Sequence, residues 1–182
     1  MSLSSEERSQ LVALAREAVE AHLRGRPLPR RPGAEGVLAE SRGCFVTLTN
    51  AGRLRGCIGT FQPPGPLAST LPQMAAAAAR DSRFILDPVT AGELPKLKVE
   101  VSILSPLEPM ESLQELRLGT HGIYVVYGGR AGCFLPEVEK EMDWNAEQFL
   151  DNCCTHKAGL PPGAWKQPGA TVFLFTSEKF DS

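Results

Sequence analysis

Apolar and polar residues alternate in the first half of the chain in a pattern that predicts paired strands beside a helix. Residues 43–61 alternate around the turn-forming triplet Asn50-Ala51-Gly52, which is typical of a β-hairpin. Residues 67–80 are rich in alanine and contain no glycine, so a helix is favoured there. Residues 97–104 alternate again, as a half-buried strand does. The pattern therefore predicts a hairpin, a helix and a strand, in that order.

The second half repeats this order. Residues 123–135 indicate a hairpin around Gly128-Gly129, residues 145–157 a helix opened by a capping pair of Asn145 and Gln148, and residues 171–176 a last strand. The stretches 52–58 and 128–134 also look alike, which predicts an internal duplication. Because hairpins joined through helices favour antiparallel pairing, the predicted fold class is α+β, with a largely antiparallel sheet and flanking helices.

An amphipathic helix precedes these elements. Ser4 and Glu7 form a predicted capping box, and apolar residues then recur at helical spacing until Gly25. Residues 24–33 are rich in proline and arginine, which predicts an extended linker whose arginines either bind an anion or are simply solvated. We predict a single domain over residues 1–182, with helix and linker in residues 1–36 and the sheet and remaining helices in residues 37–182.

The composition limits the classes of function that are expected for this protein. The hydrophobic content of 42%, the charged content of 22% and the formal charge of -2 are ordinary for a soluble globular protein. Without a large basic field, nucleic-acid binding is not expected. The chain shows neither a leader pattern nor an apolar run near the ~18 residues that cross a bilayer, so we expect a cytoplasmic protein without membrane contact. Five scattered cysteines are typical of reduced thiols.

The segment Leu54-Arg55-Gly56-Cys57-Ile58-Gly59-Thr60-Phe61 is the strongest candidate for a functional site. Glycine within a strand marks a bulge or a close approach to the backbone, and here two glycines flank a cysteine. Alternation places Arg53, Arg55 and Cys57 on one face unless the glycines bulge the strand, and a nearby guanidinium favours a reactive thiolate. The competing interpretation is that Cys57 is a small buried apolar residue.

Three other sets of residues invite a chemical interpretation. Cys153, Cys154 and His156 do not complete the four ligands of a closed zinc site, so no metal is predicted. His121 precedes a strand and is either an acid or base, a substrate contact, or structural. Glu100 lies within an alternating strand; it faces water or, if buried, is expected to pair with an arginine of the cysteine segment. No cofactor motif is present.

Several short segments follow residues 54–61 in a fixed order, and together they resemble the AMMECR family, which includes protein A of the AmmeMemoRadiSam systems. The segments that carry the resemblance are Leu54–Phe61, Asp81-Ser82-Arg83-Phe84, Glu93-Leu94, Val99–Leu104, His121-Gly122-Ile123, Phe134-Leu135-Pro136-Glu137-Val138, Trp144, Phe149-Leu150, Lys157-Ala158-Gly159-Leu160, Trp165 and Phe175–Phe180. Cys133 departs from the threonine that the family commonly shows there, and Cys154-Thr155-His156 is loosely matched.

The resemblance implies an α+β fold with a duplicated arrangement and a smaller subdomain, and it makes the cysteine segment the suspected functional site. It implies no known reaction. Bacterial and archaeal members resemble partners of a Memo-type protein and of a radical SAM protein, which suggests a shared modification or redox pathway.

Two functional hypotheses follow. In the first, an accessory protein binds a partner or a small anionic ligand, with a binding set of Arg55, Gly56, Ile58, Gly59, Thr60 and Glu100. In the second, Cys57 is a catalytic thiol, Arg55 binds an anionic group, a glycine backbone leaves room for the substrate, and His121 is the acid or base. Thiol redox sensing by the adjacent cysteines is a third option.

Overall fold

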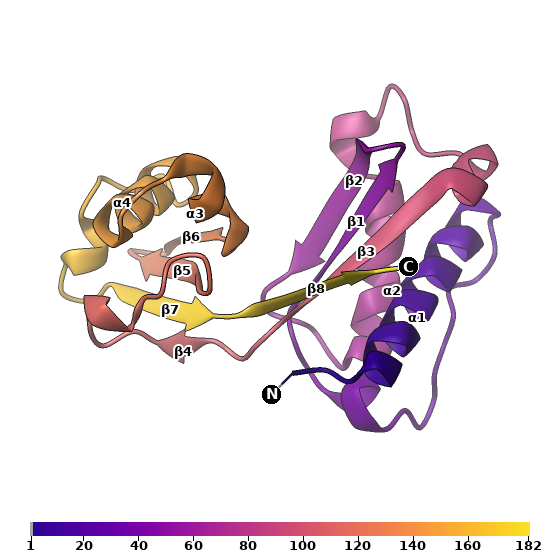
Figure 1. Cartoon of the computed structure of the whole chain (residues 1–182), viewed down its shortest axis with the longest axis horizontal. Coiled ribbons are helices and arrows are strands. Elements are labelled where there is room, and N and C mark those ends of the chain that lie inside the picture. Colours follow the sequence, from indigo (N-terminus) through magenta and orange to yellow (C-terminus); the bar gives the residue numbers. More distant parts are fainter. Residues whose placement is uncertain (1) are drawn as a thin grey trace. The chain divides into compact units, whose positions relative to one another are not determined.

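A computed structural model describes residues 2–182 and divides them into two compact units (Figure 1). Unit 1 contains the described residues up to Leu104 together with Glu178–Ser182, and unit 2 is Ser105–Ser177. The N-terminal helix belongs to unit 1. Within residues 2–182, none of the helices combines the length and the apolar composition that crossing a lipid bilayer requires.

Unit 1 packs two helices on a four-stranded sheet. Its elements are α1 (Ser5–Leu23), β1 (Cys44–Asn50), β2 (Arg53–Thr60), α2 (Leu67–Ala79), β3 (Leu97–Leu104) and the C-terminal β8 (Ser177–Asp181). The strand order is β2-β1-β3-β8, and β1 pairs antiparallel with both β2 and β3. The capping box of Ser4 and Glu7 opens α1 as predicted. Apolar residues of both helices and of the inward strand positions form one core.

The predicted turn between β1 and β2 supports the expected hairpin. Ala51 and Gly52 have φ of 50° and 80°, the left-handed pair that a two-residue hairpin turn requires. Because the right-handed twist of the strands matches this turn, the register of the hairpin is fixed at its closed end.

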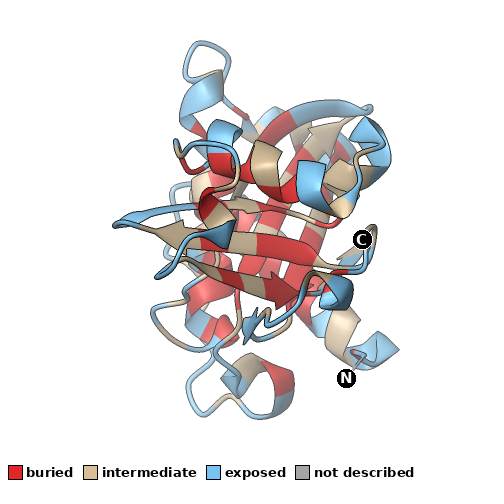
Figure 2. Cartoon of the chain, turned by 90° about the vertical axis from the view of Figure 1, so that its left-hand side faces the viewer, coloured by how far each residue is buried: buried red, intermediate tan, exposed pale blue. Residues whose placement is uncertain are grey.

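Unit 2 is smaller and carries its own core. Its elements are β4 (Glu108–Pro109), β5 (Gly122–Tyr127), β6 (Arg130–Phe134), α3 (Glu137–Met142), α4 (Ala146–His156) and β7 (Thr171–Phe175). The strand order is β4-β7-β5-β6, again antiparallel. Asn145 and Gln148 form the predicted capping box of α4. Figure 2 shows buried positions along the strands and exposed positions in the loops.

The two units repeat one topology, as the predicted duplication requires. In each, a hairpin precedes a helix, and the third strand pairs with the first strand of the hairpin, giving the orders β2-β1-β3 and β6-β5-β7. Gly56 and Gly132, which occupy corresponding positions in the two hairpins, each lie against backbone at the end of the helix that follows. A Cβ on Gly56 would lie 1.9 Å from the carbonyl oxygen of Ala78, at the end of α2, and one on Gly132 would lie 2.5 Å from the backbone nitrogen of Ala158, after α4. The fold is therefore α+β with a repeated strand and helix arrangement.

Candidate functional site around Cys57

The backbone of Cys57 is bound by side chains at the edge of the sheet. Strand β2 has a neighbour on one side only, so its outer N–H and C=O groups need other partners. The N–H of Cys57 donates to Oδ2 of Asp81 over 3.0 Å, and Nη2 of Arg83 donates to the carbonyl oxygen of Cys57 over 3.3 Å. Asp81 and Arg83 thus take the place of a missing strand and fix the position of Cys57.

Asp81 is itself held by the turn that follows α2. Its Oδ1 accepts the backbone N–H of Arg83 over 3.1 Å, which caps the short 3-10 helix Ser82–Phe84. The guanidinium of Arg83 donates through Nε and Nη2 to the same carboxylate. These hydrogen bonds from Arg83, aided by the N–H of Cys57, hold the pKa of the Asp81 carboxyl well below its usual range, although burial opposes the effect. Asp81 is therefore an anion at neutral pH.

The thiol of Cys57 lies in a line of polar side chains that crosses the sheet. Its Sγ is 3.2 Å from Oγ1 of Thr47, the residue paired with it on β1. Thr47 is in turn paired with Glu100 on β3, whose Oε1 lies 3.7 Å from Nζ of Lys179 on β8. We call Cys57, Thr47, Glu100 and Lys179 the Cys57 row. Because Gly56 faces α2, alternation places this row on the other face of the sheet, away from the helices.

Strand alternation predicts that Arg55 shares this face with Cys57, but in the structure it does not. The pairing of β1 and β2 shifts register between Leu48 and Thr49, so Arg55 is the extra residue of a bulge. Its side chain is 4% exposed and donates to Oε1 of Glu93 over 2.8 Å and to Oδ2 of Asp87 over 3.2 Å. The bulge therefore diverts Arg55 from Cys57 to a separate ion-pair cluster.

This cluster is electrostatically balanced. The hydrogen bonds that Arg55 donates lower the pKa of the Glu93 carboxyl to about 2, and the same hydrogen bonds raise the pKa of the Arg55 guanidinium. Asp87 also accepts from Nη2 of Arg53 over 2.8 Å. A polar hollow of about 280 Å³ lies beside the four groups. An anionic ligand of Arg55 would have to displace Asp87, which is the more exposed of the two carboxylates.

The remaining residues of the predicted binding set have structural contacts. A Cβ on Gly59 would lie 2.3 Å from both the carbonyl oxygen of Cys44 and the ring of Phe45. The room that Gly56 and Gly59 leave is thus filled by the chain's own atoms rather than left for a substrate. Ile58 packs against the core of unit 1, and Thr60 Oγ1 donates to the carbonyl oxygen of Gln62 over 3.1 Å.

Glu100 and His121 differ from expectation in their partners. An arginine partner was expected for Glu100 only if it were buried, but its side chain is 26% exposed and the cation beside it is Lys179. His121 belongs to unit 2, whereas Cys57 belongs to unit 1. Nδ1 of His121 accepts the backbone N–H of Arg117 over 3.0 Å. That nitrogen therefore closes a turn, and an acid or base role for His121 stays a prediction.

The other four cysteines have thiols that burial holds protonated. Burial raises the pKa of Cys44 to about 12 and of Cys133 to about 11, and it raises the pKa of Cys153 and Cys154 as well. Cys133 occupies the position in unit 2 that corresponds to Cys57, but its neighbours across the strands are Tyr124 and Phe173. The polar surroundings of Cys57 are thus absent from the corresponding position in unit 2.

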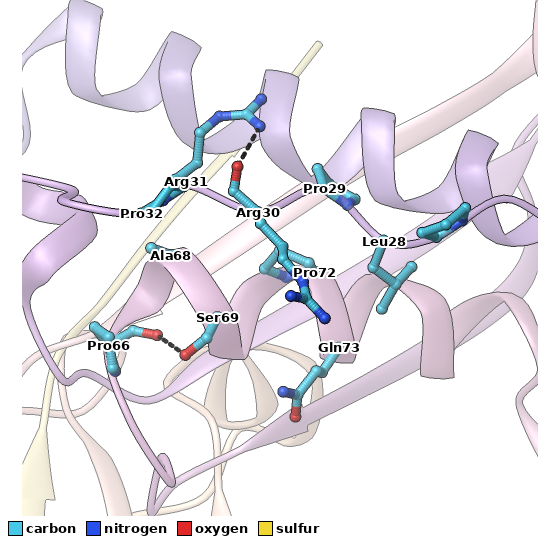
Figure 3. Close-up of a pocket in the computed structure, with 11 residues that line it drawn as sticks. Leu28, Pro29, Arg30, Arg31, Pro32, Pro66, Ala68, Ser69, Pro72 and Gln73 are labelled. Atoms are coloured by element: carbon cyan, nitrogen blue, oxygen red, sulfur yellow. Dashed lines mark hydrogen bonds between the residues drawn. The ribbon is translucent and has the colours of Figure 1, made fainter.

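The predicted linker forms one wall of an apolar groove on the helix side of unit 1 (Figure 3). The groove has a volume of about 790 Å³, and α2 supplies the other wall through Pro66, Ala68, Ser69, Pro72 and Gln73. Arg30 and Arg31 both line the groove, and Arg31 is hydrogen-bonded to Glu17 on α1. The linker is therefore folded against the helices, with one arginine engaged in an ion pair.

Four residues that shape the site were not among the predicted site residues, namely Thr47, Asp81, Arg83 and Glu93, although the last three lie in segments that carry the family resemblance. A signal for Asp81 was present, since an aspartate just after a helix and two residues before an arginine is a typical cap of a following turn. Thr47 was marked by its outward place in the alternation of β1. Glu93 lay in a recognisable capping pattern with Thr90, but nothing local linked it to Arg55.

Comparison with known proteins places this geometry in a family. Residues 12–180 match the AMMECR1 family. A protein of Methanothermobacter thermautotrophicus is 42% identical over 98% of this chain and 95% of its own length, and one of Methanocaldococcus jannaschii is 38% identical over 98% and 92%. An uncharacterised Pyrococcus horikoshii protein of known crystal structure superposes with a TM-score of 0.85 at 36% identity, covering 99% of this chain and 93% of that one. The chain therefore belongs to the AMMECR1 family.

Proposed function

We propose that this protein is an accessory protein that binds a protein partner through the Cys57 row. The observation that supports binding over catalysis is the pairing of the ionisable groups around the thiol. Asp81 is bonded to Arg83 and to the N–H of Cys57, and Glu100 is paired with Lys179. A general base needs a free lone pair directed at the proton that it removes. Among the described residues of unit 1, each of these carboxylates is already engaged by a cation.

The row has the properties of a recognition surface. It is polar and carried on a sheet, and Cys57, Thr47 and Glu100 are half-buried while Lys179 is exposed. Its edge residue Cys57 donates a hydrogen bond to Asp81 and accepts one from Arg83, which fixes its position. Such a preorganised surface loses little conformational entropy when a partner binds. The resemblance to AmmeMemoRadiSam proteins suggests a Memo-type or a radical SAM protein as the partner. In this role Cys57 contributes size and a weak hydrogen bond rather than a nucleophile.

The test measures binding of purified Memo-type and radical SAM proteins from one genome to the full chain by titration calorimetry. We expect Cys57→Ser to keep the affinity within about threefold, because serine keeps the size and the contact with Thr47. Glu100→Lys places two cations side by side and should weaken binding by at least about tenfold. Glu20→Lys on the exposed face of α1 is the matched control.

Each outcome bears on the proposal. Loss of binding with Glu100→Lys but not with Glu20→Lys supports it. Failure of the wild-type chain to bind either protein overturns it, as does equal binding by the Glu100→Lys and Glu20→Lys variants.

A second candidate function is thiol chemistry at Cys57, which the 3.2 Å contact between Sγ and Thr47 Oγ1 favours. The Arg83 guanidinium, which is hydrogen-bonded to the Cys57 carbonyl, also places a cation near this residue. Measuring the rate of iodoacetamide alkylation residue by residue against pH tests this candidate. Thiol chemistry predicts that Cys57 reacts faster than the other four thiols, whose pKa values burial raises. A rate profile like that of a model thiol would remove the motivation for this candidate.

A further inference from the structure

The loop after α2 exposes two neighbouring aliphatic side chains. Ile85 is 76% exposed and Leu86 is 97% exposed, the two highest values among the large apolar residues that the structure describes as exposed. Single exposed aliphatic residues are ordinary, but an adjacent pair at the tip of one loop forms a concentrated apolar feature. The loop follows Asp81 and contains Arg83, and these two residues fix the backbone of Cys57.

The loop is held at three points, although its tip is exposed. At its start, Asp81 is bonded to Arg83 and Cys57. In its middle, the ring of Phe84 lies 5.7 Å from the guanidinium carbon of Arg83 and 6.0 Å from that of Arg55. At its end, Asp87 is bonded to Arg53 and Arg55.

Backbone hydrogen bonds tighten the same turn. The N–H of Ile85 donates to the carbonyl of Ser82 over 3.3 Å, and that of Asp87 donates to the carbonyl of Phe84 over 3.0 Å. Ile85 and Leu86 are therefore presented by a closed turn rather than by a slack loop. Presenting them in a fixed conformation lowers the entropy cost of docking.

We propose that residues 82–88 are a docking loop, in which Leu86 and Ile85 insert into an apolar pocket of a protein partner. The charged residues around the tip of the loop indicate which charges should border the partner's pocket. Arg53, Arg80 and Arg83 are exposed near or within the loop, and Asp87 is the one exposed carboxylate among residues 80–88. Arg53 is paired with Asp87 and Arg83 with Asp81, so the three arginines exceed these two carboxylates by one positive charge. A pocket bordered by aspartate and glutamate side chains is complementary to this surface. The inference rests on the proposed partner-binding function and adds a second contact surface to the Cys57 row.

The experiment compares three forms of the full chain in titrations against the Memo-type and radical SAM proteins used to test the proposed function. The forms are the wild type, the double variant Ile85→Ser/Leu86→Ser, and the control Met142→Ser, which changes an apolar residue of unit 2 that is 50% exposed. We expect the double variant to bind at least about tenfold more weakly and the control to bind like the wild type. The melting temperature of the double variant should stay at the wild-type value, since neither Ile85 nor Leu86 is buried. Raising the salt concentration should weaken wild-type binding, as an arginine rim requires.

The outcomes separate this inference from the proposed function. If the wild type binds and the double variant binds equally well, the docking loop is wrong while partner binding stands. If the wild type binds neither protein, partner binding and the docking loop both fail. A wild-type dimer that the double variant abolishes, seen by light scattering, would make a second copy the occupant and overturn the assigned partner.

Discussion

Asp81 accepts the backbone N–H of Cys57 over 3.0 Å and thereby completes the hydrogen bonding of an edge strand with a side chain. The same carboxylate is bonded to Arg83, whose guanidinium reaches the carbonyl of Cys57. One aspartate thus joins the end of α2, the docking loop and the cysteine strand. A substitution of Asp81 should therefore alter the structure at the end of α2, in the docking loop and in the cysteine strand.

Replacing Asp81 should destabilise unit 1. Asp81→Ala removes a buried acceptor and leaves both the Cys57 N–H and the Arg83 guanidinium without it, so we expect a loss of about 2 kcal/mol in the free energy of unfolding. Asp81→Asn keeps an acceptor oxygen and should cost about half as much. Urea unfolding followed by circular dichroism measures both values. Wild-type stability in the alanine variant would contradict the assigned role of Asp81.

Arg55 and Arg53 allow a matched comparison between a buried and an exposed arginine of one strand. Arg55→Ala leaves the half-buried Glu93 carboxylate unpaired and should cost about 3 kcal/mol, the range expected when one partner of a buried ion pair is removed. Arg53 is 67% exposed, so Arg53→Ala should cost less than about 1 kcal/mol. Chemical unfolding of both variants decides the matter. Equal costs would mean that the buried ion pairs of Arg55 contribute no more to stability than the exposed ion pair of Arg53.

Gly56 is required by the close approach of α2. A Cβ there would lie 1.9 Å from the carbonyl oxygen of Ala78, which is backbone and cannot rotate away. We expect Gly56→Ala to cost about 3 kcal/mol or to prevent folding. Gly92→Ala is the control, since its Cβ would meet nothing closer than 3.8 Å. Soluble expression and thermal unfolding compare the two, and a stable Gly56→Ala variant would show that α2 lies further from β2.

The pH dependence of stability should report Glu93. Its pKa is lowered from 4.5 to about 2, so its ion pair stabilises the folded state above the unfolded pKa and is lost as the pH falls through the folded value. Between about pH 5 and pH 2, the wild type should lose on the order of 2 kcal/mol more than Glu93→Gln does. Urea unfolding at stepped pH values gives the difference. Parallel curves for the two proteins would exclude a strongly lowered pKa of Glu93.

The elements of the fold were predictable because their causes are local. The capping boxes of α1 and α4, the left-handed turn residues at Ala51 and Gly52, and the alternation of the strands depend on residues only a few positions apart. The duplication was visible for the same reason, since matching glycines follow matching turns. Cys57 could be singled out by its flanking glycines.

The partners of the site residues were not predictable in this way. Strand alternation predicts that Arg55 lies on the face of Cys57. A bulge instead directs its side chain to Glu93, which is 38 positions away in the chain. The guanidinium that reaches Cys57 belongs instead to Arg83, from the turn after α2. Glu100 is paired with Lys179 from the last strand rather than with an arginine.

By itself the sequence determined the helices, the hairpins, the repeated order of elements and the segment that carries the candidate thiol. Only the tertiary structure decided which charge pairs with which carboxylate, which face Cys57 occupies and which apolar side chains stay exposed. The physical reason is the separation in the chain over which each kind of interaction acts. Caps, turns and periodicity act between neighbours, whereas a bulge in one strand and the closure of a distant loop are fixed by packing across the whole unit.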